Sequence, residues 1–229
     1  MPTDPVPGLW ALATLAVYLL ARGLYQRRPR WYTAPLLVTW AACFLSALVL
    51  HASYREYLRG THWLVLLLGP ATVAFALPIY EQRQVIRQYW ATLLIGVLAG
   101  SLIAFASSWG LAWALGLSPE VRLSLLPRSV TTPFALDFTR KVGGIPELTA
   151  ACVVITGLFG AVLGELLLTW LPLRSAFARG ALFGMGAHSV GTAKAREVGE
   201  VEGSVAGLTM VLAGLLSALL APVLAHFMR

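Results

Sequence analysis

The sequence predicts an all-α integral membrane protein, and three of its features lead to that prediction. First, 58% of the 229 residues are hydrophobic and only 12% are charged, whereas a soluble domain is about half apolar and a quarter charged. Second, the apolar residues form runs near the roughly 20 residues that a membrane-spanning helix needs. Third, short segments rich in arginine separate these runs, as in cytoplasmic loops of membrane proteins. We expect about seven or eight membrane segments, three of them broken.

Composition also excludes several classes of protein. The net charge is +7, but no basic face with interleaved aromatic residues is visible, so we expect no nucleic-acid partner. Cys43 and Cys152 lie within apolar runs and are interpreted as small core residues, not as metal ligands or a disulfide. No nucleophile–base pair, metal-ligand spacing or nucleotide loop is present, so we expect no enzyme activity and no cofactor.

The first two predicted spans cover residues 6–21 and 34–51. The first begins without the basic segment of a cleavable signal peptide, so we expect it to be retained. Arg22 and Arg27 follow it, and the positive-inside bias places that loop in the cytoplasm and the N-terminus outside. Neither span carries a polar cluster at membrane depth. Residues 1–61 are therefore predicted to be a scaffold or dimerisation region, and residues 62–229 a transport core.

The third span, residues 62–80, is expected to be broken at Gly69-Pro70 and at Pro78, because proline lacks an amide donor and clashes with the preceding turn. Residues 90–117 are uncharged and contain Gly96 and Gly100 at a spacing that favours helix packing. Residues 123–136 are shorter and hold a polar group between two prolines. Long spans follow at residues 148–173, interrupted only by Glu165, and at residues 204–226.

Residues 179–203 are the most polar stretch within the apolar sequence. Polar and ionisable residues at membrane depth indicate a functional site by default. If residues 187–196 are helical, His188, Thr192 and Arg196 lie on one face. Small residues would let neighbouring backbones approach closely; these are Gly184, Gly186, Gly191, Ala193 and Ala195. The alternative is a glycine-rich loop outside the membrane.

A short internal similarity relates TVAFAL, residues 72–77, to TTPFAL, residues 131–136. Transporters often contain such repeats, and paired segments interrupted by glycine or proline point toward a site near the midplane of the membrane. The charges flanking the two copies leave open whether they are inverted.

Five motifs, in this order, resemble the LrgB/CidB family: LLLGPATVAFALPIYEQ, LLPRSVTTPFAL, GGIPELTA, ITGLFGAVLGE and GMGAHSVGTAKAREVGEVEG. The resemblance covers roughly residues 64–222 and extends to plant relatives that are similar to the plastidial glycolate/glycerate translocator. It implies one of two functions: transport of small carboxylates such as glycolate, glycerate or pyruvate, or holin-like/antiholin control of murein hydrolase export and autolysis. It also implies a small LrgA/CidA-type membrane partner and a location in the bacterial cytoplasmic (inner) membrane. The sequence departs from the expected pattern at Lys194 and Arg196.

A small 2-hydroxy or 2-oxo acid is bound by an arginine fork or by amides at a helix N-terminus, with hydroxyls for its remaining oxygens. The alternative for Arg128 is that it snorkels to the interface while the threonines bond their own helix. The candidate substrate-binding residues are Arg128, Ser129, Thr131, Thr132, His188, Ser189, Thr192 and, from the first copy of the repeat, Thr72.

A proton or a sodium ion is the candidate coupling ion. His188 has an unperturbed pKa of about 6.5, which suits proton coupling, although a buried histidine is more often a packing residue. The ion-pair candidates are His188, Glu165, Lys194 and Arg196. Glu165 is expected to pair with Arg174, Arg179 or Lys194 rather than to carry a proton. Glu197, Glu200 and Glu202 are interpreted as a solvated loop.

The favoured hypothesis is a secondary transporter of small monocarboxylates that works by alternating access and forms a homodimer. Its alternative is a holin-like regulator that acts by oligomerisation with the LrgA/CidA-type partner. The membrane lipid is the remaining expected partner.

Overall fold

The computed structural model describes residues 6–27, 33, 35–51, 54–74 and 76–227, and every regular element within these ranges is a helix. The predicted all-α membrane class is therefore confirmed. Four described helices are long and apolar enough to cross a membrane, and shorter or broken helices form the other predicted segments. Contacts divide the chain into two units, Met1–Pro70 and Ala71–Arg229, and each is described by itself.

The first unit packs three helices, α1 (Val6–Arg27), α2 (Pro35–Val49) and α3 (Tyr54–Leu66). A polar contact joins all three, because the Thr14 hydroxyl lies 3.1 Å from the Tyr57 hydroxyl and the Cys43 Sγ lies 3.8 Å from Thr14. The Trp10 and Tyr57 rings meet edge to face with their centroids 5.4 Å apart. The helices match the first two predicted spans, while the role of this unit stays a prediction.

The break predicted near Gly69 is present. Helix α3 ends at Leu66, Leu67 is a turn, and α4 (Leu68–Ala74) begins at the next residue. Pro70 is the third residue of α4, where its missing amide would have had no partner in the helix. Helix α5 (Ala76–Glu81) carries Pro78.

Helix α6 (Arg83–Ala114) is longer than the predicted span, because it begins at Arg83 and bends at Tyr89, where φ is −118°. The two glycines expected to promote packing differ. The Gly100 position faces the Met185 side chain of α10, whereas open space lies at the Gly96 position.

A first helical hairpin consists of α7 (Pro119–Leu125), the short 3-10 helix η2 (Leu126–Ser129) and α8 (Thr132–Val142). It turns through the extended residues Val130 and Thr131, so the predicted break near Arg128 is confirmed. Gly143 ends α8 at a φ of +86°, a conformation that glycine adopts without steric cost. The tip residues Val130 and Phe134 pack on Val153 of α9 (Pro146–Trp170), and Pro146 opens that helix.

Helix α10 (Ala176–Val198) doubles back on itself at His188, where φ is 40° and ψ is −123°. A Cβ at Gly191 would collide with the Phe183 carbonyl oxygen and lie 2.7 Å from the Ala187 Cβ. In a straight helix, Gly191 and Phe183 would be about 12 Å apart. Residues 176–198 therefore form a second helical hairpin with its tip at His188, and the alternative of a loop is wrong for this stretch.

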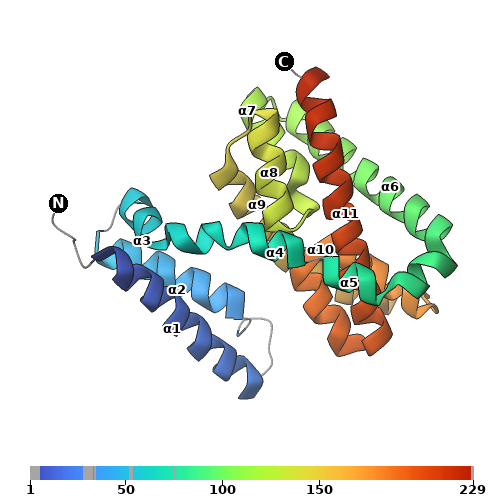
Figure 1. Ribbon diagram of the computed structural model, residues 1–229, viewed down its shortest axis with the longest axis horizontal. Coiled ribbons are helices and arrows are strands. Elements are labelled where there is room, and N and C mark those ends of the chain that lie inside the picture. Colours follow the sequence, from blue (N-terminus) through green and yellow to red (C-terminus); the bar gives the residue numbers. More distant parts are fainter. Residues whose placement is uncertain (1–5, 28–32, 34, 52–53, 75, 228–229) are drawn as a thin grey trace. The chain divides into compact units, whose positions relative to one another are not determined.

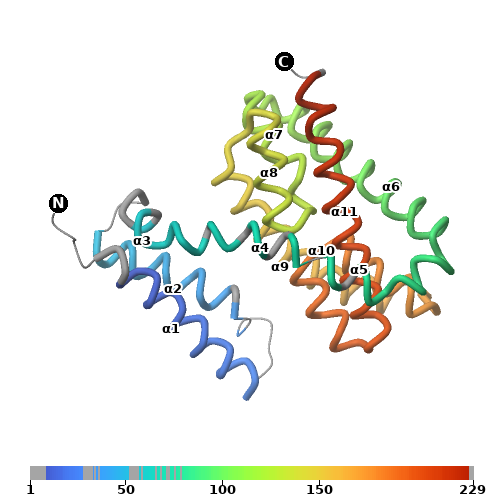
Figure 2. Tube along the Cα trace, in the orientation of Figure 1, coloured from blue at the N-terminus to red at the C-terminus, as the bar shows by residue number. Residues whose placement is uncertain are grey.

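The two hairpins occupy opposite halves of α9 and of α11 (Glu200–Phe227). The first half of α9 holds the first hairpin through Thr149, and its second half holds α10 at Gly157 and Gly164. The first half of α11 holds α10, and its second half, near Ala221, packs on the first hairpin. Figures 1 and 2 show α8 and α10 along the two halves of α11. Helices α9 and α11 therefore run antiparallel, and the hairpins enter from opposite ends.

Residues 119–170 and 176–227 share this order of a hairpin followed by a long helix, and the two long helices are antiparallel, as in an inverted repeat. The two stretches are related by an offset of 57 residues. Val153 packs with Ala135 in the first stretch, and the residues 57 positions later, Met210 and Thr192, contact each other in the second. The repeat therefore differs from the predicted pairing of residues 72–77 with 131–136. In the structure, the equivalent of the Thr131 region is the His188 region, which shares its geometry but few of its residues.

Candidate functional site

The tips of the two hairpins meet beside the middle of α9, where η2 contacts both α9 and α10. Val153 joins them. Its side chain packs with Val130, Phe134 and Ala135 of the first hairpin, and its carbonyl oxygen lies 2.9 Å from Nε2 of His188 in the second. The structure thus brings together the two polar stretches that the sequence singled out, although they are about 57 residues apart in the chain.

Arg128 lies in η2 and is half-buried. Its Nε donates a hydrogen bond of 2.7 Å to Ser108 Oγ of α6, and its Nη2 lies 3.5 Å from Ser107 Oγ. The Ser108 hydroxyl itself donates to the Ala104 carbonyl at 2.7 Å, so its lone pairs are turned to the guanidinium. Arg128 forms no ion pair with a carboxylate among the described residues. Only neutral hydroxyl groups contact the guanidinium, and an anionic ligand would balance its positive charge.

The N-terminus of α8 lies at the same tip. Thr131 precedes the helix, is only 4% exposed, and its hydroxyl makes no capping hydrogen bond. The first amides of a helix have no partner within it, and they carry the positive end of the helix dipole. Ser129 and Thr132 are half-buried on either side of Thr131. These residues have the positions that binding a carboxylate would require.

His188 is 3% exposed, and both of its ring nitrogens have partners. Nε2 lies 2.9 Å from the Val153 carbonyl oxygen, and Nδ1 lies 3.3 Å from Ser189 Oγ. The ring fits against α9 because position 157 is glycine: a Cβ there would lie 2.6 Å from the His188 Cε1. The Thr192 hydroxyl donates to the His188 carbonyl at 2.9 Å. In this conformation His188 and Thr192 therefore pack the tip, whereas Ser189 is exposed and begins the second half of α10.

The ion pairs of α10 agree with one expectation and correct another. Lys194 Nζ lies 2.6 Å from Glu165 and 2.8 Å from Glu197, so the predicted pairing of Glu165 is confirmed with Lys194 as its partner. Arg179 instead donates to Glu202 at 2.5 and 3.0 Å.

The interpretation of Glu202 as part of a solvated loop was wrong. Helix α11 begins at Glu200, and the Glu202 side chain is 7% exposed against α10. Glu200 is exposed, as expected. Arg196 is exposed as well and forms no ion pair within the part of the chain that the structure describes. Thr72 lies in α4, and its side chain is outside the described residues.

The expected close packing of small residues holds for part of the set. Gly184, Gly191 and Ala195 are buried, and a Cβ at Gly184 would collide with the Ala206 carbonyl of α11. Gly186 and Ala193 are exposed.

Sequence reasoning missed Ser107 and Ser108, which hold Arg128. The sequence signal was present, because they are adjacent hydroxyl residues in an otherwise apolar run. It could not be interpreted, since serine in a membrane helix usually bonds its own backbone. Cys152 directly precedes Val153 in α9, so it lies near the tips.

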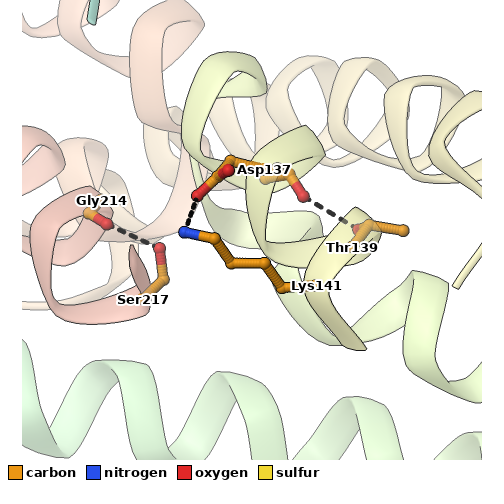
Figure 3. Close-up of polar contacts among 6 residues, drawn as sticks. Asp137, Thr139, Lys141, Gly214 and Ser217 are labelled. Carbon is orange, nitrogen blue, oxygen red and sulfur yellow. Dashed lines mark hydrogen bonds and ion pairs between the residues drawn. The ribbon is translucent and has the colours of Figure 1, made fainter. Parts of the chain in front are cut away.

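A fully buried hydroxyl network supports the first hairpin. Ser124 Oγ accepts from the Ile145 amide at 2.7 Å, Thr149 donates to the Ser124 carbonyl at 2.9 Å, and the Thr139 and Thr149 hydroxyls lie 2.9 Å apart. On α8, Asp137 and Lys141 pair at 2.6 Å, and on α11 the Ser217 hydroxyl donates to the Gly214 carbonyl (Figure 3). These charges are therefore matched to each other.

An apolar cavity of about 250 Å³ lies between α6 and α11. Its lining is aliphatic and aromatic apart from Ser101, which suits a lipid chain and not a carboxylate. It is lined by Leu98, Ala99, Ser101, Leu102, Phe105, Leu216 and Leu220.

Residues 14–227 match the LrgB-like family. The uncharacterized protein YwbG of Bacillus subtilis is 40% identical over 94% of this chain and 96% of its own length. The holin-like protein CidB of Staphylococcus aureus is 31% identical over 94% of both chains. No solved structure matches.

Proposed function

This chain belongs to the LrgB-like family of multi-pass membrane proteins, and from that premise we propose that it carries small monocarboxylates across the membrane. The observation that carries the proposal is Arg128, a guanidinium without a carboxylate partner among the described residues, at the point where two helical hairpins meet. A lone charge at membrane depth is costly, so such residues mark solute pathways.

The site has the chemistry of one carboxylate and one or two further oxygens. Nε of Arg128 is taken by Ser108, which leaves the two Nη groups as a fork for the carboxylate. Ser129, Thr131 and Ser189 supply hydroxyls near the tips. The position equivalent to Arg128 in the second repeat is Met185, since 128 + 57 is 185, so the repeat supplies one guanidinium and not two. One cation favours a monocarboxylate over a dicarboxylate.

Alternating access follows from the inverted repeat, because two equivalent hairpins on opposite sides can open in turn toward opposite faces of the membrane. In this proposal the N-terminus lies outside the cytoplasmic membrane of a bacterium, and a proton or sodium ion drives uptake. Homodimerisation through the first unit and an LrgA/CidA-type partner complete the proposal.

The second candidate is a holin-like regulator of murein hydrolase export and autolysis. The name of the CidB relatives favours it, since these proteins are called holin-like. In this candidate the chain would form or regulate a lesion, together with its membrane partner, and would have no need of a selective anion site.

Uptake of radiolabelled pyruvate and glycolate into liposomes that contain only this chain, across an imposed pH gradient, tests the proposal. We expect saturable uptake that Arg128→Ala abolishes. The matched control is Arg140→Ala, which removes an exposed arginine of α8 outside the site. Wild-type uptake by Arg128→Ala would refute the site. Leakage of an unrelated dye without saturable uptake would favour the holin-like function.

A further inference from the structure

The two hairpins are equivalent in geometry but are attached to α9 in different ways. The first hairpin is tied by buried hydroxyls: Ser124, Thr139 and Thr149 are each 0% exposed and bond one another or the backbone at 2.6–2.9 Å. A buried polar group that loses its hydrogen-bond partner destabilises the structure. Sliding this hairpin along α9 would break several such bonds at once.

The second hairpin instead meets α9 through glycines. A Cβ at Gly160 would collide with the Gly186 carbonyl, and one at Gly164 would lie 2.6 Å from the Phe183 ring. Backbones that touch through glycine gain dispersion energy without interlocking side chains. Small sliding of packed helices is an established mode of conformational change. Such a contact resists a shear motion less than a set of directional hydrogen bonds does.

The turns of the two hairpins also differ in backbone strain. Val130 and Thr131 have ordinary extended conformations. His188 has a positive φ of 40° with a ψ of −123°, which is rare for a residue with a side chain. Residues with strained backbone angles store conformational energy and concentrate at ligand clamps and switch regions. A movement of the tip that relaxes His188 would recover this energy.

The charged contacts of α10 lie away from its tip. Arg179 binds Glu202 at the start of α11, and Lys194 binds Glu165, half of which is exposed to the surroundings. These pairs hold the base of the hairpin. At the tip, the hydrogen bond between the His188 ring and the Val153 carbonyl joins α10 to α9.

From this asymmetry we infer that the α10 hairpin is a mobile gate, which separates from Val153 at its His188 tip while the α7–α8 hairpin stays fixed to α9. The inference goes beyond the proposed function, because it holds for any solute that passes between the tips. Arg128 belongs to the fixed hairpin, so the anion site stays in place while the gate moves over it.

Spin-label distances in nanodiscs test the gate, with both native cysteines replaced by alanine. The first pair, Glu147→Cys with Gly186→Cys, joins the start of α9 to the tip of α10, two residues before His188. The control pair, Arg140→Cys with Thr169→Cys, joins α8 to the end of α9. All four positions are exposed, and the helical rise puts each pair about 20–30 Å apart.

We expect two populations for the first pair, separated by roughly one helical turn of 5 Å, with pyruvate changing their ratio. The control pair should give one narrow distance in every condition. A single narrow distance for the first pair with and without pyruvate, or equal spread in the control pair, would overturn the inference. Because this readout needs no uptake, it can fail or succeed independently of the carrier function.

A measurement on the unmodified chain guards against effects of labelling. Hydrogen exchange followed by mass spectrometry should show amides of residues 184–192 exchanging at least about tenfold faster than those of residues 126–135, because local opening sets the exchange rate. Equal protection of the two tips would contradict a gate in α10.

Discussion

Replacing Ser108 by alanine tests whether this serine positions the guanidinium of Arg128. The substitution removes the acceptor of the 2.7 Å bond from Nε but leaves the charge in place. A hydrogen bond to a charged group contributes about 1.5–3 kcal/mol, and since Arg128 is half-buried we reduce this to about 1–2 kcal/mol. Tenfold in affinity corresponds to about 1.4 kcal/mol. We therefore expect the KM for pyruvate or glycolate to rise roughly 5- to 30-fold.

The assay is initial-rate uptake into liposomes over a range of substrate concentrations. A positioning role changes KM and leaves the maximal rate near that of the wild type, whereas misfolding lowers the maximal rate through loss of active protein. Ser108→Thr keeps the hydroxyl and should restore KM. The control is Ser107→Ala, whose contact is 3.5 Å long and should matter less than twofold. A KM for Ser108→Ala within twofold of wild type would refute the reasoning.

Three further predictions concern stability, measured as the melting temperature of the purified protein. Gly157→Ala should destabilise by about 1–3 kcal/mol, because the added methyl would lie 2.6 Å from the His188 ring; Gly96→Ala, which faces open space, should be neutral. Thr149→Val should cost about 1–3 kcal/mol, since it leaves buried partners unbonded. Glu202→Gln should lower the melting temperature more than Glu165→Gln, because only the first carboxylate is buried. Melting temperatures ordered the other way for the two glutamates would contradict this last prediction.

The broken segments could be predicted because their signals are local. Proline and glycine at residues 69–70 and 127–133 mark turns by their backbone chemistry alone. The polar stretch around His188 stood out against its apolar flanks, and the small residues beside it indicated close helix packing. Each of these features needs only a window of a few residues.

The rest depends on contacts that no short window contains. The sequence predicted a solvated Glu202 because two further glutamates and three glycines lie within five residues of it. Its burial follows from Arg179, which is 23 residues away. The correspondence of residues 119–170 with 176–227 could not be predicted, because the two stretches share helix geometry and not residue type: Leu126 packs on Ala221 where Phe183 packs on Gly164. Ser108 became meaningful only once the fold placed Arg128 beside it.

The inverted repeat also bears on where a solute would cross. Both hairpins, and both halves of α9 and α11 that hold them, come from one chain and lie in the second unit. A lesion formed by oligomerisation would place the solute pathway between chains. The residues at the hairpin tips lie inside each chain and would not contact such a pathway. A pathway between the tips lies within each chain, so dimerisation through the first unit would leave two independent pathways. Coexpressing wild type with an Arg128→Ala chain should then halve uptake in mixed dimers, whereas a shared pathway would lose all of it.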